Sequence, residues 1–187
     1  MKLETIEKIL NFLQNNEDKE IPRKWVYSIR QLKFINELEN HPDGVQYKHN
    51  GNLYLPNSKI TKLPNDLYVT KWLDLESCEQ LTELPDKLYV GSVLNLRYSN
   101  ITKLPDNLYV GEDLVLDFSE QITELPNNLY VVGNLWLYGT KIEDIPNNLY
   151  VGLNLYIDTP LAEKYTDEEI YKIVMLRGGQ IIGEIFR

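Results

Sequence analysis

The stretch Leu63-Pro64-Asn65-Asp66-Leu67-Tyr68-Val69 decides the fold of this chain, because it returns four more times. The later copies begin at Leu84-Pro85, Leu104-Pro105, Leu125-Pro126 and Ile145-Pro146. The five prolines stand 21, 20, 21 and 20 residues apart. A period in this range is typical of a leucine-rich repeat solenoid, in which each repeat forms one coil. The repeats therefore predict an α/β repeat fold and make function a question about the surface.

Each repeat contains a second short pattern, in which two apolar residues flank a variable one. The six copies are Leu53-Tyr54-Leu55, Leu73-Asp74-Leu75, Leu94-Asn95-Leu96, Leu114-Val115-Leu116, Leu135-Trp136-Leu137 and Leu155-Tyr156-Ile157. Alternate side chains of a strand point to opposite faces, so the leucines point inward and the central residue points outward. We expect six short parallel strands, one per coil.

Residues at the same position of successive repeats form a column, and the remaining columns separate the core from the surface. Three apolar columns predict a continuous core, and they begin at Leu67, Val69 and Ile60. A tyrosine column, Tyr68, Tyr89, Tyr109, Tyr130 and Tyr150, points outward, and its regularity favours a structural stack of rings over a binding stripe. A small polar column, Ser58, Cys78, Ser99, Ser119 and Thr140, suits a hydrogen-bonded ladder between turns, so Cys78 is expected inside.

The ends of the chain predict caps for the solenoid, whose open core and strand edges need cover. Residues 1–44 are expected to form a helical cap, with helices over 3–14 and from Pro22 to about Leu38. The repeats span 45–160. Residues 161–187 are expected to form a helix that begins at the capping box Thr166-Asp167-Glu168-Glu169, followed by a single terminal strand. The three parts are expected to act as one cooperative domain.

The order Leu-Pro-x-x-Leu, Leu-x-Leu and Ile-Thr-x-Leu-Pro resembles the short leucine-rich repeats of secreted bacterial effectors and similar arrays in phage-encoded proteins. The resemblance covers residues 45–160. It implies a non-catalytic recognition surface on the strand face. Two columns differ from the pattern of those families. In one column Ser or Thr stands where the families have asparagine, and in the other glycine stands where the effectors often have an apolar residue.

Charge and composition exclude several classes of function. The net charge is −9, and residues 63–160 alone hold 5 basic against 15 acidic residues. Nucleic-acid binding needs the opposite sign, so no nucleic-acid partner is expected. No apolar run is long enough for a membrane span, and the N-terminus lacks a signal-peptide pattern. We expect a cytoplasmic protein, or one delivered to a host without a cleaved signal peptide.

Motifs for catalysis or cofactor binding are missing from the sequence. We find no phosphate-binding glycine loop, no Cys/His metal spacing and no calcium-loop pattern. The two histidines, His41 and His49, lie in expected turns. A reactive cysteine must be exposed as a thiolate, whereas Cys78 is expected inside. The sequence therefore predicts no enzyme, no catalytic residue, no metal site and no cofactor.

The outward strand positions vary between repeats, so they are free of a stacking role and are the candidate site. They are expected to line the concave face and comprise Trp72, Asp74, Asn95, Arg97, Asp113, Val115, Asp117, Trp136, Tyr138 and Tyr156. The last three form one aromatic group. Trp72 and Tyr54 form another, about 14 Å away at three strand spacings.

Exposed Trp and Tyr on a rigid surface are typical binding anchors. The leading interpretation is a module that binds an unidentified protein partner, as a monomer or weak homo-oligomer. One alternative is a structural protein that self-associates through the aromatic groups. Another is an acidic decoy of a nucleic-acid-binding protein, whose binding would weaken steeply with salt.

Overall fold

The computed structural model describes residues 23–187, with side chains from residue 31 onward. The chain divides into two units, one up to Pro42 and one from Asp43 to Arg187, and each is described by itself. In the first unit, helix α2 (Arg23–Glu39) confirms the helix predicted from Pro22 to about Leu38. The helix predicted over residues 3–14 lies outside the described residues.

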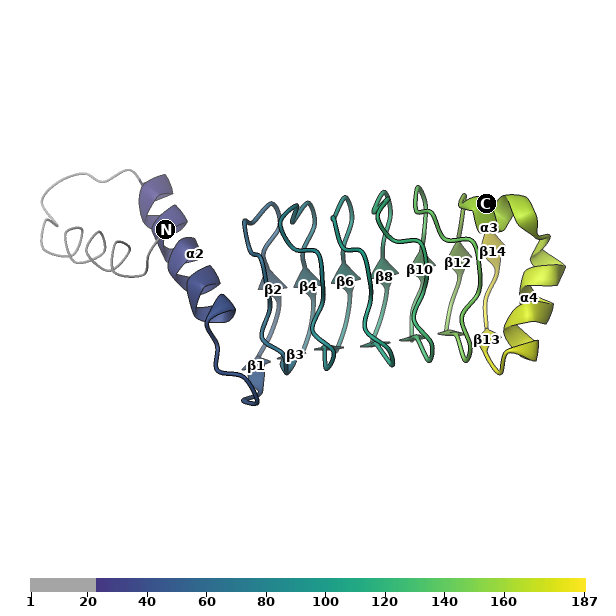
Figure 1. Ribbon diagram of the computed structural model, residues 1–187, viewed down its shortest axis with the longest axis horizontal. Helices are drawn as coiled ribbons and strands as arrows, with labels where there is room; N and C mark the ends of the chain where they lie inside the picture. The colour runs from purple at the N-terminus through teal and green to yellow at the C-terminus, as the bar shows by residue number, and fades with distance from the viewer. Residues whose placement is uncertain (1–22) are drawn as a thin grey trace, which may run out of the picture. The chain divides into compact units, whose positions relative to one another are not determined.

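The second unit is a parallel β-solenoid with two sheets (Figure 1). Sheet A contains β1 (Tyr47–His49), β3 (Leu67–Val69), β5 (Tyr89–Val90), β7 (Tyr109–Val110), β9 (Tyr130–Val131), β11 (Tyr150–Val151) and β13 (Gln180–Ile181). Sheet B contains β2 (Leu53–Tyr54), β4 (Leu73–Asp74), β6 (Leu94–Asn95), β8 (Leu114–Val115), β10 (Leu135–Trp136), β12 (Leu155–Tyr156) and β14 (Ile185–Phe186). Every neighbouring pair is parallel, and repeat positions pair with each other, as Leu73 with Leu94.

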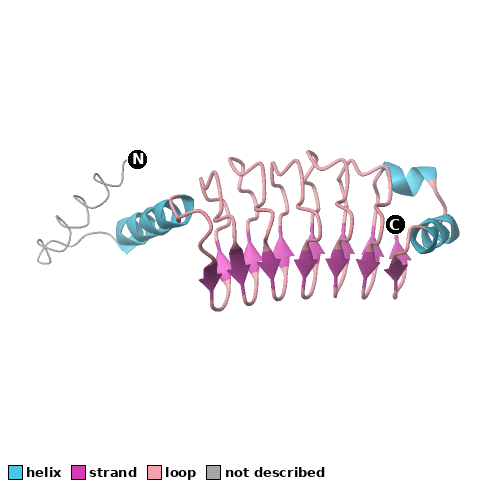
Figure 2. Ribbon diagram, turned by 60° about the horizontal axis from the view of Figure 1, so that its bottom comes forward, coloured by secondary structure: helices cyan, strands magenta, loops and turns pink. Residues whose placement is uncertain are grey.

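Each coil passes through a strand of sheet A, a tight turn, a strand of sheet B and a return segment that holds the Leu-Pro pair. Figure 2 shows the two rows of strands on one side of the coils and the return segments as loops on the other. The six strands expected from the Leu-x-Leu pattern are all present in sheet B. Sheet A was not predicted, because its strands were read only as an apolar column with an outward tyrosine.

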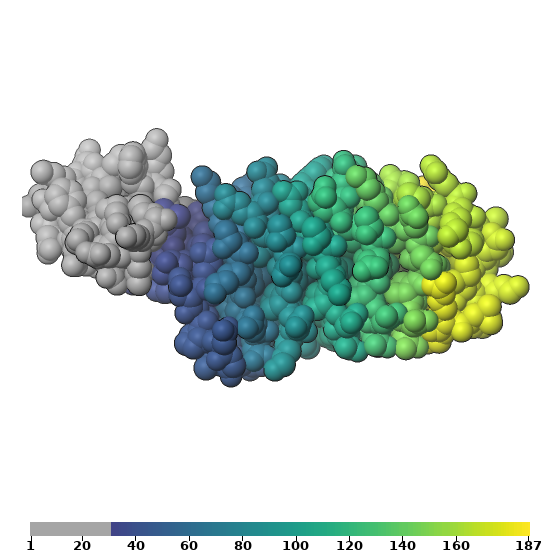
Figure 3. Space-filling model, viewed as in Figure 1, coloured from purple at the N-terminus to yellow at the C-terminus, as the bar shows by residue number. Residues whose placement is uncertain are grey.

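The inward columns form one continuous core. The columns that begin at Leu67, Val69 and Ile60 are buried in every coil, as are the paired apolar residues of sheet B from β2 to β12. Burial of each such side chain contributes about 1.5–3 kcal/mol. The successive coils form an unbroken surface in the space-filling view (Figure 3). The predicted core is therefore confirmed.

The small polar column is buried and hydrogen-bonded, as expected. The thiol of Cys78 donates to the Leu55 carbonyl at 3.0 Å and lies 3.4 Å from the Ser58 hydroxyl. In the next two coils, the hydroxyls of Ser99 and Ser119 lie 3.2 Å apart. These bonds join neighbouring coils at the point where each strand of sheet B ends, so they satisfy buried polar groups there.

The tight turn between the sheets brings backbones of successive coils into close contact. The amide of Gly111 donates to the Val90 carbonyl at 2.9 Å. A Cβ atom on Gly111 would overlap the backbone carbonyl oxygen of Gly91 in the preceding coil. The glycine is therefore required for stacking at this turn.

The C-terminal segment adds two short helices and a further partial coil. Helix α3 spans Pro160–Lys164 and helix α4 spans Asp167–Leu176, which begins at the predicted capping box of Thr166 and Glu169. The expected single terminal strand is instead two strands, β13 and β14, which extend both sheets. Among residues 23–187, no helix combines the length and apolar character needed to cross a lipid bilayer.

Candidate functional site

Four aromatic side chains meet on the outer face of sheet B, and we call them the aromatic cluster: Trp136, Tyr138, Tyr156 and Phe186. The rings of Trp136 and Tyr156 stack with centroids 3.7 Å apart and planes 2° apart. Phe186 extends the stack, 4.9 Å from Tyr156. Tyr138 stands across the stack, with its plane 66° from Trp136 and 68° from Tyr156.

The strand register explains this stack. Trp136 is paired with Tyr156 across β10 and β12, and Tyr156 is paired with Phe186 across β12 and β14. Residues in register on parallel strands lie one strand spacing apart, about 4.8 Å, which suits stacked rings. The structure thus brings together the three predicted aromatic residues and adds Phe186.

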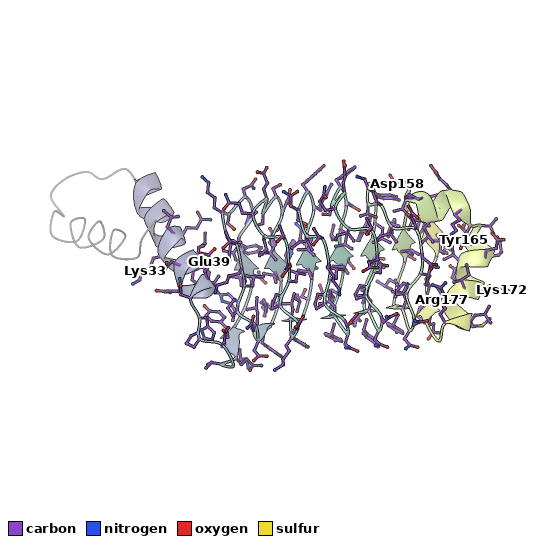
Figure 4. The ribbon with its side chains drawn as sticks, in the orientation of Figure 1. Lys33, Glu39, Asp158, Tyr165, Lys172 and Arg177 are labelled. Carbon is purple, nitrogen blue, oxygen red and sulfur yellow. The ribbon has the colours of Figure 1, made fainter. Side chains whose placement is uncertain are left out.

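Carboxylates surround the aromatic cluster. Asp113 accepts hydrogen bonds from the Asn134 amide at 2.7 Å and from the Trp136 indole N–H at 3.4 Å. Asp158 is exposed and accepts from the Gly139 amide at 2.6 Å; Figure 4 shows it on the coil beside α3. These two acids lie at the rim of the cluster and orient the backbone around it.

Asp117 differs from the rim acids because its side chain is buried. It accepts a hydrogen bond from the Tyr138 amide at 3.1 Å. Burial raises the pKa of Asp117, the Tyr138 bond and the Arg97 charge oppose that shift, and Asp158 adds to it. Burial also raises the pKa of the Tyr138 phenol, with further contributions from Asp117 and Asp158. Both carboxylates thus add negative charge beside the Tyr138 phenol.

The middle of the face, over β4 and β6, is polar and internally bonded. Asn95 is buried and donates to Asp74 at 3.1 Å and to Glu76 at 3.2 Å. Burial raises the pKa of Asp74. Asn95 also accepts from the Arg97 amide at 3.1 Å, so its side chain is engaged within the sheet and not presented to a partner.

Arg97 lies beside a second pair of rings that sequence reasoning did not include. Its guanidinium carbon is 5.5 Å from the centre of Tyr98 and 6.0 Å from that of Phe118, and those two rings stack 5.1 Å apart. Its Nε atom is buried without a hydrogen-bond partner. Both aromatic residues have positive φ angles of 53° and 59° just after their strands. Tyr98 and Phe118 share one repeat position with Gly139, a short distance after the strand of sheet B, and this shared position was the available signal.

The other predicted aromatic group, Trp72 with Tyr54, is also present. Their rings lie 5.8 Å apart in an edge-to-face arrangement, and both side chains are exposed. Strands β4 and β10 are three steps apart in sheet B, as predicted for the two groups. Val115, half-buried on β8, lies between Asn95 and Trp136 in the register.

The tyrosine column forms a ladder on sheet A, away from the aromatic cluster. Consecutive rings stack with centroids 4.2, 5.1, 5.6 and 4.2 Å apart, from Tyr68 to Tyr150. Each ring therefore covers the faces of its neighbours, and mainly ring edges and hydroxyls face outward.

Cys78, the one cysteine of the sequence, is buried. Burial raises the pKa of the Cys78 thiol, which keeps it protonated at neutral pH. Within residues 23–187, no three His, Cys, Asp or Glu side chains meet in a way that could hold a metal ion.

Comparison of the chain with protein-family models, with curated proteins and with solved structures gives no match in any of the three.

Proposed function

We propose that the protein is a non-catalytic binding module that recognises a protein partner through the outer face of sheet B. The observation that carries the proposal is the aromatic cluster, four rings brought together on a surface that two sheets hold rigid. Trp and Tyr anchors dominate the energetics of many protein interfaces. They contribute large contact areas and lose little conformational entropy on binding.

The ordered support of the rings adds to this proposal. Trp136 is held by Tyr156 on one side and by a hydrogen bond to Asp113. A partner would meet a site whose side chains are already in place, so fewer rotamers are immobilised on binding. By the resemblance of its repeats, we propose further that the protein acts as a bacterial or phage effector in a cytoplasmic compartment.

Affinity purification with the full chain as bait, followed by measurement with the purified partner, tests the proposal. The double variant Trp136→Ala/Tyr138→Ala is expected to weaken the free energy of partner binding by more than about 1 kcal/mol, which is about a fivefold loss of affinity. Tyr130→Ala removes an exposed ring from sheet A and is the matched control, with affinity expected to stay unchanged. Tyr138→Ala alone keeps the stack of Trp136 on Tyr156. A loss of affinity in this variant therefore reports lost contacts with the partner and not a disturbed sheet.

Equal affinity of the wild-type chain and Tyr138→Ala for every captured partner would refute the placement of the site. Light scattering tests the oligomeric state separately. A monomer at micromolar concentration agrees with the proposal, whereas a dimer that Trp136→Ala/Tyr138→Ala dissociates would make the partner a second copy of this chain.

A further inference from the structure

We infer that the aromatic cluster receives a cationic side chain, so that the partner supplies a segment bearing lysine or arginine. This inference rests on the proposed function and names the chemistry of the partner at the same site. It is carried by two features, the arrangement of the rings and the unpaired acids around them.

Tyr138 has a different orientation from the stacked rings of the aromatic cluster. Tyr138 lies 6.4 Å from Trp136 and 6.2 Å from Tyr156, at a steep angle to both. Ring faces attract a cation and ring edges repel it, so a cation at the aromatic cluster would be received on the face of Tyr138 and not at the edges of the stack. Trp and Tyr rings are the strongest aromatic partners for ammonium and guanidinium groups.

The rim acids, Asp113 and Asp158, form no salt bridge with the described residues. No Lys or Arg nitrogen of those residues lies within 4.0 Å of either carboxylate. Other acids of the same solenoid do have such partners, as Asp66 with Lys87 at 3.1 Å. Asp158 accepts the Gly139 amide on one carboxylate oxygen, which leaves its second oxygen for a partner, whereas both oxygens of Asp113 already accept hydrogen bonds, from the Asn134 amide and the Trp136 indole N–H.

Arg97 shows that this surface accepts a guanidinium beside rings. It lies over the Tyr98–Phe118 stack, and its charge acts on Asp117. Among the described residues, no Lys or Arg lies over a ring of the aromatic cluster in the way that Arg97 lies over Tyr98 and Phe118. The cation for the aromatic cluster therefore comes from another molecule.

A partner of different chemistry fits this site less well. An apolar segment packed on the rings would remove water from Asp113 and Asp158 without replacing it, which carries a desolvation penalty. An acidic segment would meet like charges. A basic segment is attracted by the rim acids as it approaches and contacts the rings when bound.

The test uses the full chain, labelled with ¹⁵N at tryptophan, and follows the indole N–H signal of Trp136. The probe is the acetylated and amidated peptide Gly-Arg-Gly-Arg-Gly, and the matched probe carries neutral citrulline in place of each arginine. The arginine peptide is expected to shift the Trp136 signal at millimolar concentration. The citrulline peptide is expected to leave it unchanged.

Single substitutions test which residues of the chain bind the arginine peptide. Tyr138→Ala and Asp158→Asn are each expected to weaken binding of the arginine peptide by about two- to fivefold, as exposed cation–π and ion-pair contacts do. Glu83→Gln is the control for Asp158→Asn, because it removes one negative charge from an exposed position on the return segment. It is expected to change binding less than Asp158→Asn.

The outcomes separate this inference from the proposed function. Equal shifts with both peptides, no shift of Trp136, or equal effects of Asp158→Asn and Glu83→Gln would each overturn the inference. The proposed function fails instead if the affinity of a captured partner is unaffected by Tyr138→Ala. A partner that needs Tyr138 but binds Asp158→Asn normally would keep the function and reject the cation.

Discussion

Replacement of Tyr89 by alanine tests whether the tyrosine ladder of sheet A stabilises the solenoid. The Tyr89 ring stacks on Tyr68 at 4.2 Å and on Tyr109 at 5.1 Å, with planes 5° and 8° apart. Stacked pairs contribute about 0.5–1.5 kcal/mol beyond the area that they bury. Loss of two pairs is therefore expected to lower the free energy of unfolding by about 1–3 kcal/mol.

The end of the ladder provides the internal comparison. Among the described residues, Tyr68 stacks on one tyrosine only, so Tyr68→Ala is expected to lower the free energy of unfolding by about 0.5–1.5 kcal/mol through lost ring stacking. The double variant removes the shared pair once, so the two substitutions should be less than additive by the same amount. Tyr89→Phe keeps both ring contacts and is expected to cost less than Tyr89→Ala.

Equilibrium unfolding in urea, followed by far-ultraviolet circular dichroism, measures all four variants against the wild-type chain. Two results would refute the reasoning. One is strict additivity of Tyr68→Ala and Tyr89→Ala. The other is a loss at Tyr89 no larger than that at Tyr68, which would mean that the rings stack without stabilising the fold.

Three further predictions concern the core, the turn and the ionisable rings. Cys78→Ser is expected to change the free energy of unfolding by less than about 1 kcal/mol, because serine occupies the same repeat position in other coils. Cys78→Val removes the hydrogen-bond donor to the Leu55 carbonyl and is expected to lower the free energy of unfolding by about 1 kcal/mol more. Thermal melting distinguishes the two variants. Gly111→Ala is expected to cost about 1–3 kcal/mol, since its Cβ would overlap the Gly91 carbonyl, and a wild-type melting temperature would contradict that overlap. Stability is also expected to fall as pH rises above about 10, because the folded state keeps phenols protonated that ionise in the unfolded chain. The phenols with raised pKa are those of Tyr89, Tyr130, Tyr138 and Tyr171. Urea midpoints at about pH 8 and pH 11 measure this fall, which Tyr89→Phe should reduce.

Sheet B could be predicted from the sequence because each of its strands is marked by two inward apolar residues, as in Leu135-Trp136-Leu137. Sheet A has a similar signal, two inward apolar residues around a tyrosine, as in Leu67-Tyr68-Val69, but we interpreted it only as a core column with an outward stack of rings. The hydrogen bonds of its strands run to the neighbouring coil, as from Tyr150 to Leu129 of the preceding coil. The sequence shows the column but not the backbone bonds between coils that make it a sheet.

Part of the candidate site was missed for a related reason. Phe186 joins the aromatic cluster because residues 180–186 form one more partial coil, with its own turn at Gly183. Without the Leu-Pro stretch, this segment was read as a single strand. Its likeness to Val131-Val132-Gly133-Asn134-Leu135 was the available signal. Asn95 was included because its column varies, but variation alone does not reveal that its amide bonds to Asp74 and Glu76.

The regular advance of the coils sets the span between the Tyr54–Trp72 pair and the aromatic cluster. Each coil adds one strand to sheet B, so the span changes only in increments of about 4.8 Å. Duplication or deletion of one 20- or 21-residue unit between the two groups would leave each group intact and alter only their separation. The number of coils between the two groups therefore fixes their separation. A partner that contacts both groups would bind only a solenoid with the matching number of coils, whereas a partner that contacts only the aromatic cluster would bind whatever that number is.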